Sequence, residues 1–112
     1  MGQLVSDSLS FVHVPERHRY EIRDGDTVAG FTHYLRPPDG EHVDFVHTEV
    51  DDAYEGHGLA SRLIAFALAD VAAQGRRIIP HCPFVADWLV RHHEYDDITD
   101  WPRSDDGDAS AD

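Results

Sequence analysis

Polar and apolar residues alternate over three consecutive stretches of the chain, as they do in half-buried β-strands. The stretches are also rich in β-branched and aromatic residues, and they cover residues 19–23, 27–35 and 42–50. An Asp-Gly pair separates the first two, and a Pro-Pro-Asp-Gly turn separates the second from the third. Three strands connected by short turns predict an antiparallel meander.

The alternation within 42–50 also assigns its side chains to two faces. Phe45, His47 and Glu49 are expected on one face of the strand. The other face is expected to carry Val46, Thr48 and Val50.

The period of the pattern lengthens after the third strand. Over residues 59–73, apolar residues recur with the spacing of one helical face, and many alanines favour the same conformation. Gly75 then provides a helix stop, and residues 77–82 form a short apolar strand. Pro83 suits the first turn of a second helix that has Cys82 at its N-cap. The apolar face of this helix is expected to comprise Phe84, Val85, Trp88 and Leu89.

This order of elements, β-β-β-α-β-α, predicts an α+β domain in which helices pack on a mixed sheet. A chain of 112 residues forms one domain that buries about two-thirds of its unfolded surface. Residues 1–10 are expected to be a loose lead-in and 11–99 the folded domain. Residues 100–112 hold five Asp and one Arg, so we expect a disordered acidic tail.

The composition is strongly acidic. Twenty-two Asp and Glu against nine Arg, with no Lys, leave a net charge of −13. Phosphate backbones and anionic lipids are bound by clustered cations, so neither nucleic acid nor a membrane is expected as a partner. No apolar run approaches the ~20 residues of a membrane-spanning helix. The single cysteine excludes an internal disulfide and suits a reducing cytoplasm, where we expect a monomer or a weak homodimer.

A glycine-containing loop links the third strand to the first helix through Glu55-Gly56-His57-Gly58. Glycine permits tight turns and close approach of a ligand to the backbone N–H groups. The first N–H groups of a helix have no internal partner, and with the helix dipole they attract phosphate. Taken alone, however, two glycines at this spacing are better explained as a simple connecting turn.

The wider context of this loop resembles the acetyl-CoA-binding motif of the GNAT superfamily of N-acetyltransferases, which runs Arg/Gln-x-x-Gly-x-Gly/Ala. Gly58 and Ala60 match its last two defined positions, whereas Glu55 stands where the motif has Arg or Gln. Further blocks resemble the small, single-domain YjdJ-type branch of the superfamily over about residues 16–98. These blocks are His-Thr-Glu-Val at 47–50, His-Cys-Pro-Phe-Val at 81–85 and Arg-His-His-Glu-Tyr at 91–95.

The resemblance implies a minimal GNAT-like fold, acetyl-CoA as the cosubstrate and a primary amine as the acceptor. It implies that acetyl-CoA contacts Thr48, Val50, Gly56, His57, Gly58, Leu59, Ala60, Ser61 and Arg62. No metal is expected, because the histidines near Cys82 lack the usual spacing of zinc ligands.

Three residues are candidates for the chemistry. Cys82 precedes a helix whose N-terminus would stabilise a thiolate, although a free cysteine is also commonly a small buried hydrophobe. The resemblance associates Cys82 and His47 with catalysis, and His47 could deprotonate either the thiol or the amine. Glu49 is the second candidate base. Direct attack of the amine and a covalent acetyl-Cys82 intermediate both remain open.

Two other functional classes are compatible with the sequence. The first is a non-catalytic acyl-CoA-binding or regulatory module, which the unfavourable carboxylate of Glu55 supports. The second is an interaction domain that binds no CoA. The sequence leaves the acceptor open among small amines, peptide termini and protein lysines.

Overall fold

The computed structural model of the protein describes residues 9–56 and 58–102. Predictions made for residues 1–8, His57 and residues 103–112 lie outside these described residues. In chain order, the elements are β1 (Leu9–Val14), β2 (Arg19–Asp24), β3 (Thr27–Leu35), β4 (His42–Val50), α1 (Leu59–Ala73), β5 (Arg77–Pro80) and α2 (Pro83–Arg91). The ranges expected for β2, β3, β4 and α1 agree closely with the observed ones.

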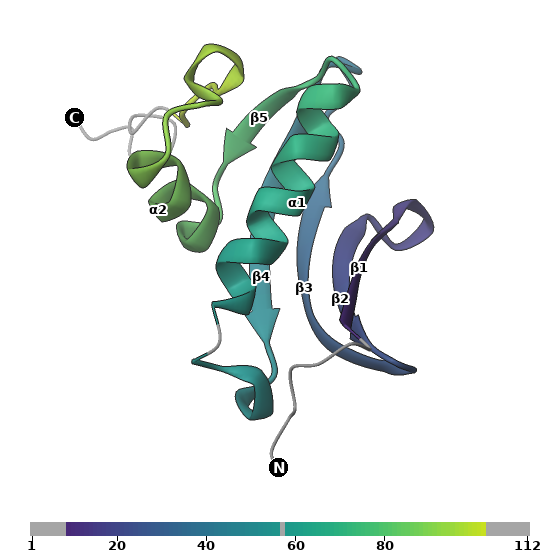
Figure 1. The fold of residues 1–112 in the computed structure, drawn as a ribbon. Helices are drawn as coiled ribbons and strands as arrows, with labels where there is room; N and C mark the ends of the chain where they lie inside the picture. Colours follow the sequence, from purple (N-terminus) through teal and green to yellow (C-terminus); the bar gives the residue numbers. More distant parts are fainter. Residues whose placement is uncertain (1–8, 57, 103–112) are drawn as a thin grey trace, which may run out of the picture.

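The strands form one mixed sheet in the order β1-β2-β3-β4-β5. Neighbours are antiparallel from β1 to β4, and β5 runs parallel to β4. Helix α1 makes the crossover between β4 and β5 that parallel pairing requires (Figure 1). The predicted α+β fold with a mixed sheet is confirmed.

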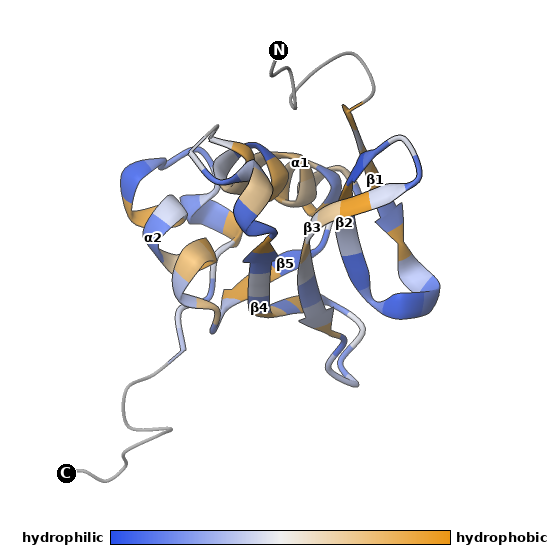
Figure 2. Ribbon diagram, turned by 90° about the horizontal axis from the view of Figure 1, so that it is seen from below, coloured by the Kyte–Doolittle hydropathy of each residue, from blue (hydrophilic) through white to orange (hydrophobic). Residues whose placement is uncertain are grey.

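Both helices cover the same face of the sheet and contact each other (Figure 2). Leu63 and Leu68 of α1 are fully buried, as are Ile22, Phe45 and Ile78 of the sheet. Burying side chains of this size stabilises the fold by about 1.5–3 kcal/mol each. Within the described part of the chain, no helix covers the opposite face, which we call the outer face.

Strand β1 is absent from the sequence-based prediction. Its register with β2 is continuous, from Leu9 opposite Asp24 to Val14 opposite Arg19. The lead-in expected at residues 1–10 therefore ends earlier, because Leu9 and Ser10 already belong to the sheet. Apolar residues occur on both faces of β1, with Phe11 on one and Val12 on the other, so the strand lacks a clean alternation.

A β-bulge interrupts β4 at Val46. His47 pairs with His33 of β3, but the next β3 residue, Tyr34, pairs with Phe45. The extra residue reverses the alternation, so Phe45 and Thr48 both point to the helix-covered face and are buried. The predicted grouping of Phe45 with His47 and Glu49 is therefore wrong, because it assumed an uninterrupted alternation and the bulge shifts the phase by one residue at Val46.

The segment after α2 returns to the free edge of β5. Thr99 bridges to Ile78, and the Asp100 N–H donates to the Ile78 carbonyl over 2.8 Å. The Asp100 carboxylate accepts two hydrogen bonds from Arg77, at 2.6 and 2.9 Å, and lies 2.9 Å from Nε2 of His42. Asp100 was expected to begin a disordered tail, but it is an ordered anchor that covers a sheet edge.

We predict that Asp100→Asn lowers the free energy of unfolding by about 1 kcal/mol at neutral pH. Hydrogen bonds from Arg77, and then from His42, lower the pKa of Asp100 to about 2. The Asp100 side chain is 44% exposed, so solvent screens the ion pair and reduces its contribution to stability. A depressed pKa stabilises the fold above the unfolded value near 4, and this contribution is lost as the pH falls towards 2.

Urea denaturation at several pH values measures this difference. Asp97→Asn removes the same charge from an exposed residue whose carboxylate has no hydrogen bond or ion pair within the described residues, so it should have little effect. A gap between wild type and Asp100→Asn that stays constant from neutral pH to about pH 2 would contradict the assignment.

Candidate active site

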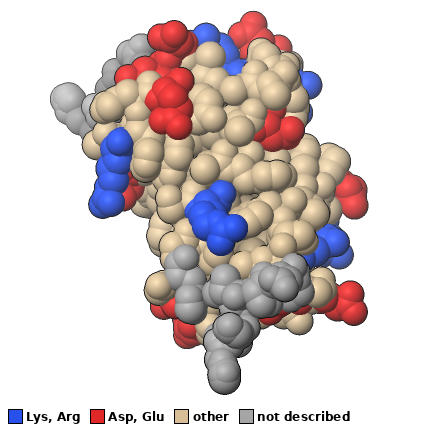
Figure 3. Space-filling model, viewed as in Figure 1, with Lys and Arg blue, Asp and Glu red and all other residues tan. Residues whose placement is uncertain are grey.

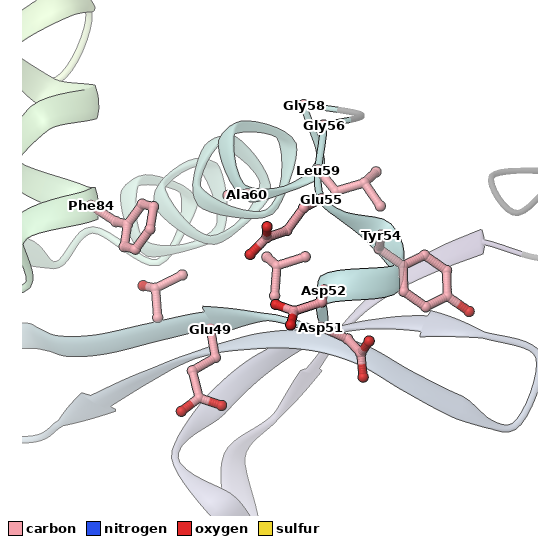
Figure 4. A pocket seen from close by; sticks show the side chains of 12 residues that line it. Glu49, Asp51, Asp52, Tyr54, Glu55, Gly56, Gly58, Leu59, Ala60 and Phe84 are labelled. Carbon is pink, nitrogen blue, oxygen red and sulfur yellow. The ribbon is translucent and has the colours of Figure 1, made fainter.

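A cleft of about 830 Å³ opens beside the C-terminal half of β4, within the usual size range of ligand sites. It is bounded by the end of β4, the following loop, the first turn of α1 and the start of α2 (Figure 4). Its lining residues are Thr48, Glu49, Val50, Asp51, Asp52, Tyr54, Glu55, Gly56, Gly58, Leu59, Ala60 and Phe84.

The cleft exists because β4 and β5 separate. Their pairing ends with Phe45 opposite Pro80, and the Cys82 N–H then donates to the Phe45 carbonyl over 2.7 Å. The chain next turns into α2, and β4 continues without a partner on that side (Figure 1). The β4 edge beyond Val46 is therefore free to bind a ligand.

This free edge presents backbone donors to the cleft. The Asp51 N–H donates to the Ala29 carbonyl of β3 over 2.8 Å. Backbone groups point to opposite edges at successive strand residues, so the N–H groups of Val50 and Thr48 point away from β3 and towards the cleft. These donors suit a polarised carbonyl oxygen.

The loop before α1 adds a second set of donors. Gly56 and Gly58 have φ angles of 87° and 71°, and a Cβ at either position would meet nothing within 4 Å. No side chain caps α1 within the described residues, and the helical ladder begins with the Arg62 N–H on the Gly58 carbonyl. The N–H groups of the first turn are therefore left for an anion.

The side chains around the cleft have the opposite electrostatic character. Glu49, Asp51, Asp52 and Glu55 border it, and no arginine is among its described lining residues. Glu55 extends from the loop towards the space between α1 and β4 (Figure 4). Other carboxylates are spread over this side of the molecule without forming a single patch (Figure 3). Neutral backbone dipoles must therefore bind any anion here against a negative surrounding charge.

Cys82 lies behind the cleft. It is at the N-cap of α2, as predicted, but it is 1% exposed and is not among the lining residues. Its sulfur is 3.3 Å from Oγ1 of Thr48, and that hydroxyl is 2.8 Å from Oγ1 of Thr32. The thiol is thus enclosed by β4 and hydrogen-bonded to it.

His47 and Glu49 lie on the other side of β4. They flank Thr48, which faces Cys82, so strand alternation directs both side chains to the outer face. Nε2 of His47 is 3.0 Å from the Glu49 carboxylate, and the side chains are 56% and 62% exposed. The structure brings the two candidate bases together but does not place His47 beside the Cys82 thiol.

Comparison with known proteins identifies the fold and the family. The family of GCN5-related N-acetyl-transferases matches residues 19–98. The chain belongs to this family. A GCN5-like candidate N-acetyltransferase from Staphylococcus aureus, solved by NMR, has the same fold, with a TM-score of 0.65 at 20% sequence identity. The match covers 88% of this chain and 94% of that one. Membership of the YjdJ-type branch stays a prediction.

Two of the predicted cofactor contacts of this GCN5-related chain, Ser61 and Arg62, lie away from the cleft. Oγ of Ser61 accepts a hydrogen bond from Trp88 Nε1 over 3.1 Å, and the Arg62 guanidinium lies 5.1 Å from the ring centre of Phe11. Neither residue lines the cleft. Arg62, the cation expected nearest to a bound phosphate group, therefore points towards β1.

Phe84 lines the cleft, whereas it was expected only as part of the apolar face of α2. It is 54% exposed and projects from α2 towards the cleft (Figure 4). Asp51, Asp52 and Tyr54 also line the cleft and were not predicted to do so. Their place directly between the strand and the glycine loop was a usable signal for the three.

The described residues contain neither a candidate metal-binding group nor a candidate membrane-spanning helix. No group of three or more His, Cys, Asp or Glu side chains is arranged there to hold a metal ion. Neither helix in that part of the chain is both long enough and apolar enough to cross a membrane.

We predict that the native Cys82 thiol reacts slowly with a disulfide reagent. If exposure requires a local opening that costs about 3 kcal/mol, the rate falls about 100-fold relative to the unfolded chain. Because Cys82 is the only cysteine, the colour change of Ellman's reagent reports this residue alone. Equal rates for the native protein and the protein in urea would show that the thiol is accessible.

Proposed function

We propose that the chain binds acetyl-CoA in the cleft and transfers the acetyl group directly to a primary amine. The observation that carries this proposal is the meeting of two backbone donor sets, at the free edge of β4 and at the start of α1. Membership of the GCN5-related family supports acetyl transfer in general. The cosubstrate, the acceptor and the roles of individual residues are our inferences.

The geometry of the cleft supports acetyl-CoA as the ligand. The open space above Gly56 and Gly58 admits a pyrophosphate to the N–H groups of the first turn of α1. The N–H groups of Thr48 and Val50 would hold the thioester carbonyl, and Phe84 offers an apolar contact to the pantetheine arm.

Glu49 is the proposed base. It lines the cleft from β4, and its carboxylate reaches the outer face, where it contacts His47. Transfer forms one N–C bond and breaks one C–S bond, while the protonated amine loses two protons. Glu49 accepts the first proton and passes it to solvent, and the second proton ends on the CoA sulfur.

We propose a structural role for Cys82. Its sulfur is buried and hydrogen-bonded to Thr48, and no basic side chain contacts it within the described residues. A covalent acetyl-Cys82 intermediate would need both access to the sulfur and a proton acceptor. Direct attack by the amine needs no access to this sulfur, and its proton acceptor is Glu49.

The second candidate is a module that binds acyl-CoA without turnover. The acidic border of the cleft favours it, because four carboxylates beside a phosphate site weaken binding and leave the family's usual cation without an equivalent.

We predict that Glu49→Gln lowers the rate of acetyl transfer at least about 100-fold, because it removes a general base. Cys82→Ala should retain transfer at close to the wild-type rate. The measurement is mass spectrometry of a panel of primary amines after incubation with acetyl-CoA. Thermal shift with acetyl-CoA serves as a binding control for each variant.

Each result distinguishes a mechanism. Full acetyltransferase activity of Glu49→Gln would show that Glu49 is not the general base. Loss of activity in Cys82→Ala, with an acetyl group on Cys82 in the wild type, would establish the covalent route. Binding of acetyl-CoA without transfer to any amine would favour the non-catalytic module. The absence of a thermal shift at millimolar acetyl-CoA would contradict both of these functions and favour an interaction domain that binds no CoA.

We predict that Glu55→Gln tightens CoA binding about fivefold, since removing one nearby negative charge is worth about 1 kcal/mol at intermediate dielectric. For the same reason, the affinity of the wild type should rise with moderate salt. Isothermal titration calorimetry measures both effects. Glu41→Gln, in the exposed turn before β4, removes an equal charge outside the cleft and is the matched control. Weaker binding by Glu55→Gln would show that Glu55 contributes a contact.

A further inference from the structure

A second hollow, of about 170 Å³, lies on the other side of β4 from α1. Arg19 of β2, Gly30 and Phe31 of β3, and Glu49 and Asp51 from the end of β4 contribute to its lining. Glu49 and Asp51 also line the main cleft, so the two spaces share these two residues at the end of β4.

The hollow is charged with opposite signs at its two ends. Phe31 lies directly opposite Glu49 in the β3–β4 ladder, and the Arg19 guanidinium carbon lies 4.6 Å from the centre of the Phe31 ring. Phe31 therefore lies between the Arg19 guanidinium and the acidic residues Glu49 and Asp51. Gly30 allows this close pairing, because a Cβ there would come within 2.8 Å of the Glu49 carbonyl oxygen.

Arg19 is held in place by a buried carboxylate. Its Nε donates to Glu21 over 2.7 Å, and Arg23 donates to the other oxygen of Glu21 over 2.8 Å. Burial raises the pKa of Glu21, but hydrogen bonds from both arginines outweigh this and hold it below the ordinary value. Within the described residues, the Nη nitrogens of Arg19 have no hydrogen-bond partner, so the fork can bind a carboxylate.

We propose that this hollow is the acceptor site and that it selects amines which also carry a carboxylate, that is, small amino acids. The acceptor carboxylate pairs with Arg19, its carbon chain lies on Phe31, and its amine faces Glu49 at the border with the cleft. This inference rests on the proposed function, because Glu49 must receive the proton of the amine.

The test compares matched acceptors. We would measure kcat/KM for 4-aminobutyrate and butylamine, and for β-alanine and propylamine, and form the ratio within each pair. The wild type should prefer the amino acid, and Arg19→Gln should reduce that preference about 10-fold or more by removing a charge-assisted contact. Arg23→Gln is the matched control, because it removes the other partner of Glu21 and leaves the hollow intact.

An unchanged ratio in Arg19→Gln, or an equal loss in Arg23→Gln, would overturn the assignment. If Arg19→Gln does not fold, Arg19→Lys keeps the charge beside Glu21, and loss of the bidentate fork should still lower the preference.

A titration with 4-aminobutyrate, followed by NMR at the Gly30 and Phe31 amides, separates this proposal from the proposed function. Chemical shift changes without acetyl transfer would support binding of the amino acid in the hollow and contradict the proposed enzymatic activity. Acetyl transfer without chemical shift changes, and without a preference for the amino acid, would contradict the acceptor site alone. If neither chemical shift changes nor acetyl transfer is seen, both proposals are contradicted.

Discussion

The end of β4–β5 pairing determines most of the site. The hydrogen bond from the Cys82 N–H to the Phe45 carbonyl is the last one between the backbones of these parallel segments within the described residues. Beyond it α2 begins, and β4 keeps a free edge that faces the first turn of α1. The cleft, its backbone donors and the enclosure of the Cys82 thiol all follow from this separation.

The neutral backbone explains how an acidic chain can accept a phosphorylated ligand. The net charge of −13 includes four carboxylates at the border of the cleft. The donors that face it are N–H groups of β4 and α1, whose positions are fixed by secondary structure and whose dipoles act at short range. Charge on this protein therefore sets affinity and salt dependence, while geometry sets where the ligand binds.

Local patterns carried much of the fold but only part of the site. The strands β3 and β4 were predictable from their β-branched and aromatic residues, and the helix α1 from an apolar stripe that is regular over its 15 residues. Strand β1 was missed because apolar residues occupy both its faces. The separation of Cys82 from His47 was not predictable, because it depends on how β4 faces α2 and on a bulge fixed by pairing with β3.

The bulge at Val46 also limits how this protein can vary in evolution. Deleting Val46 would restore an uninterrupted strand and leave the later faces unchanged, because Phe45 and Thr48 would then stand two residues apart on the helix-covered face. Inserting one more residue between His47 and Thr48 would instead turn Glu49 towards the helices and Thr48 towards solvent, so a buried hydroxyl pair would be exchanged for a buried charge. Insertions are therefore tolerable in the turn before β4, but not within its last residues.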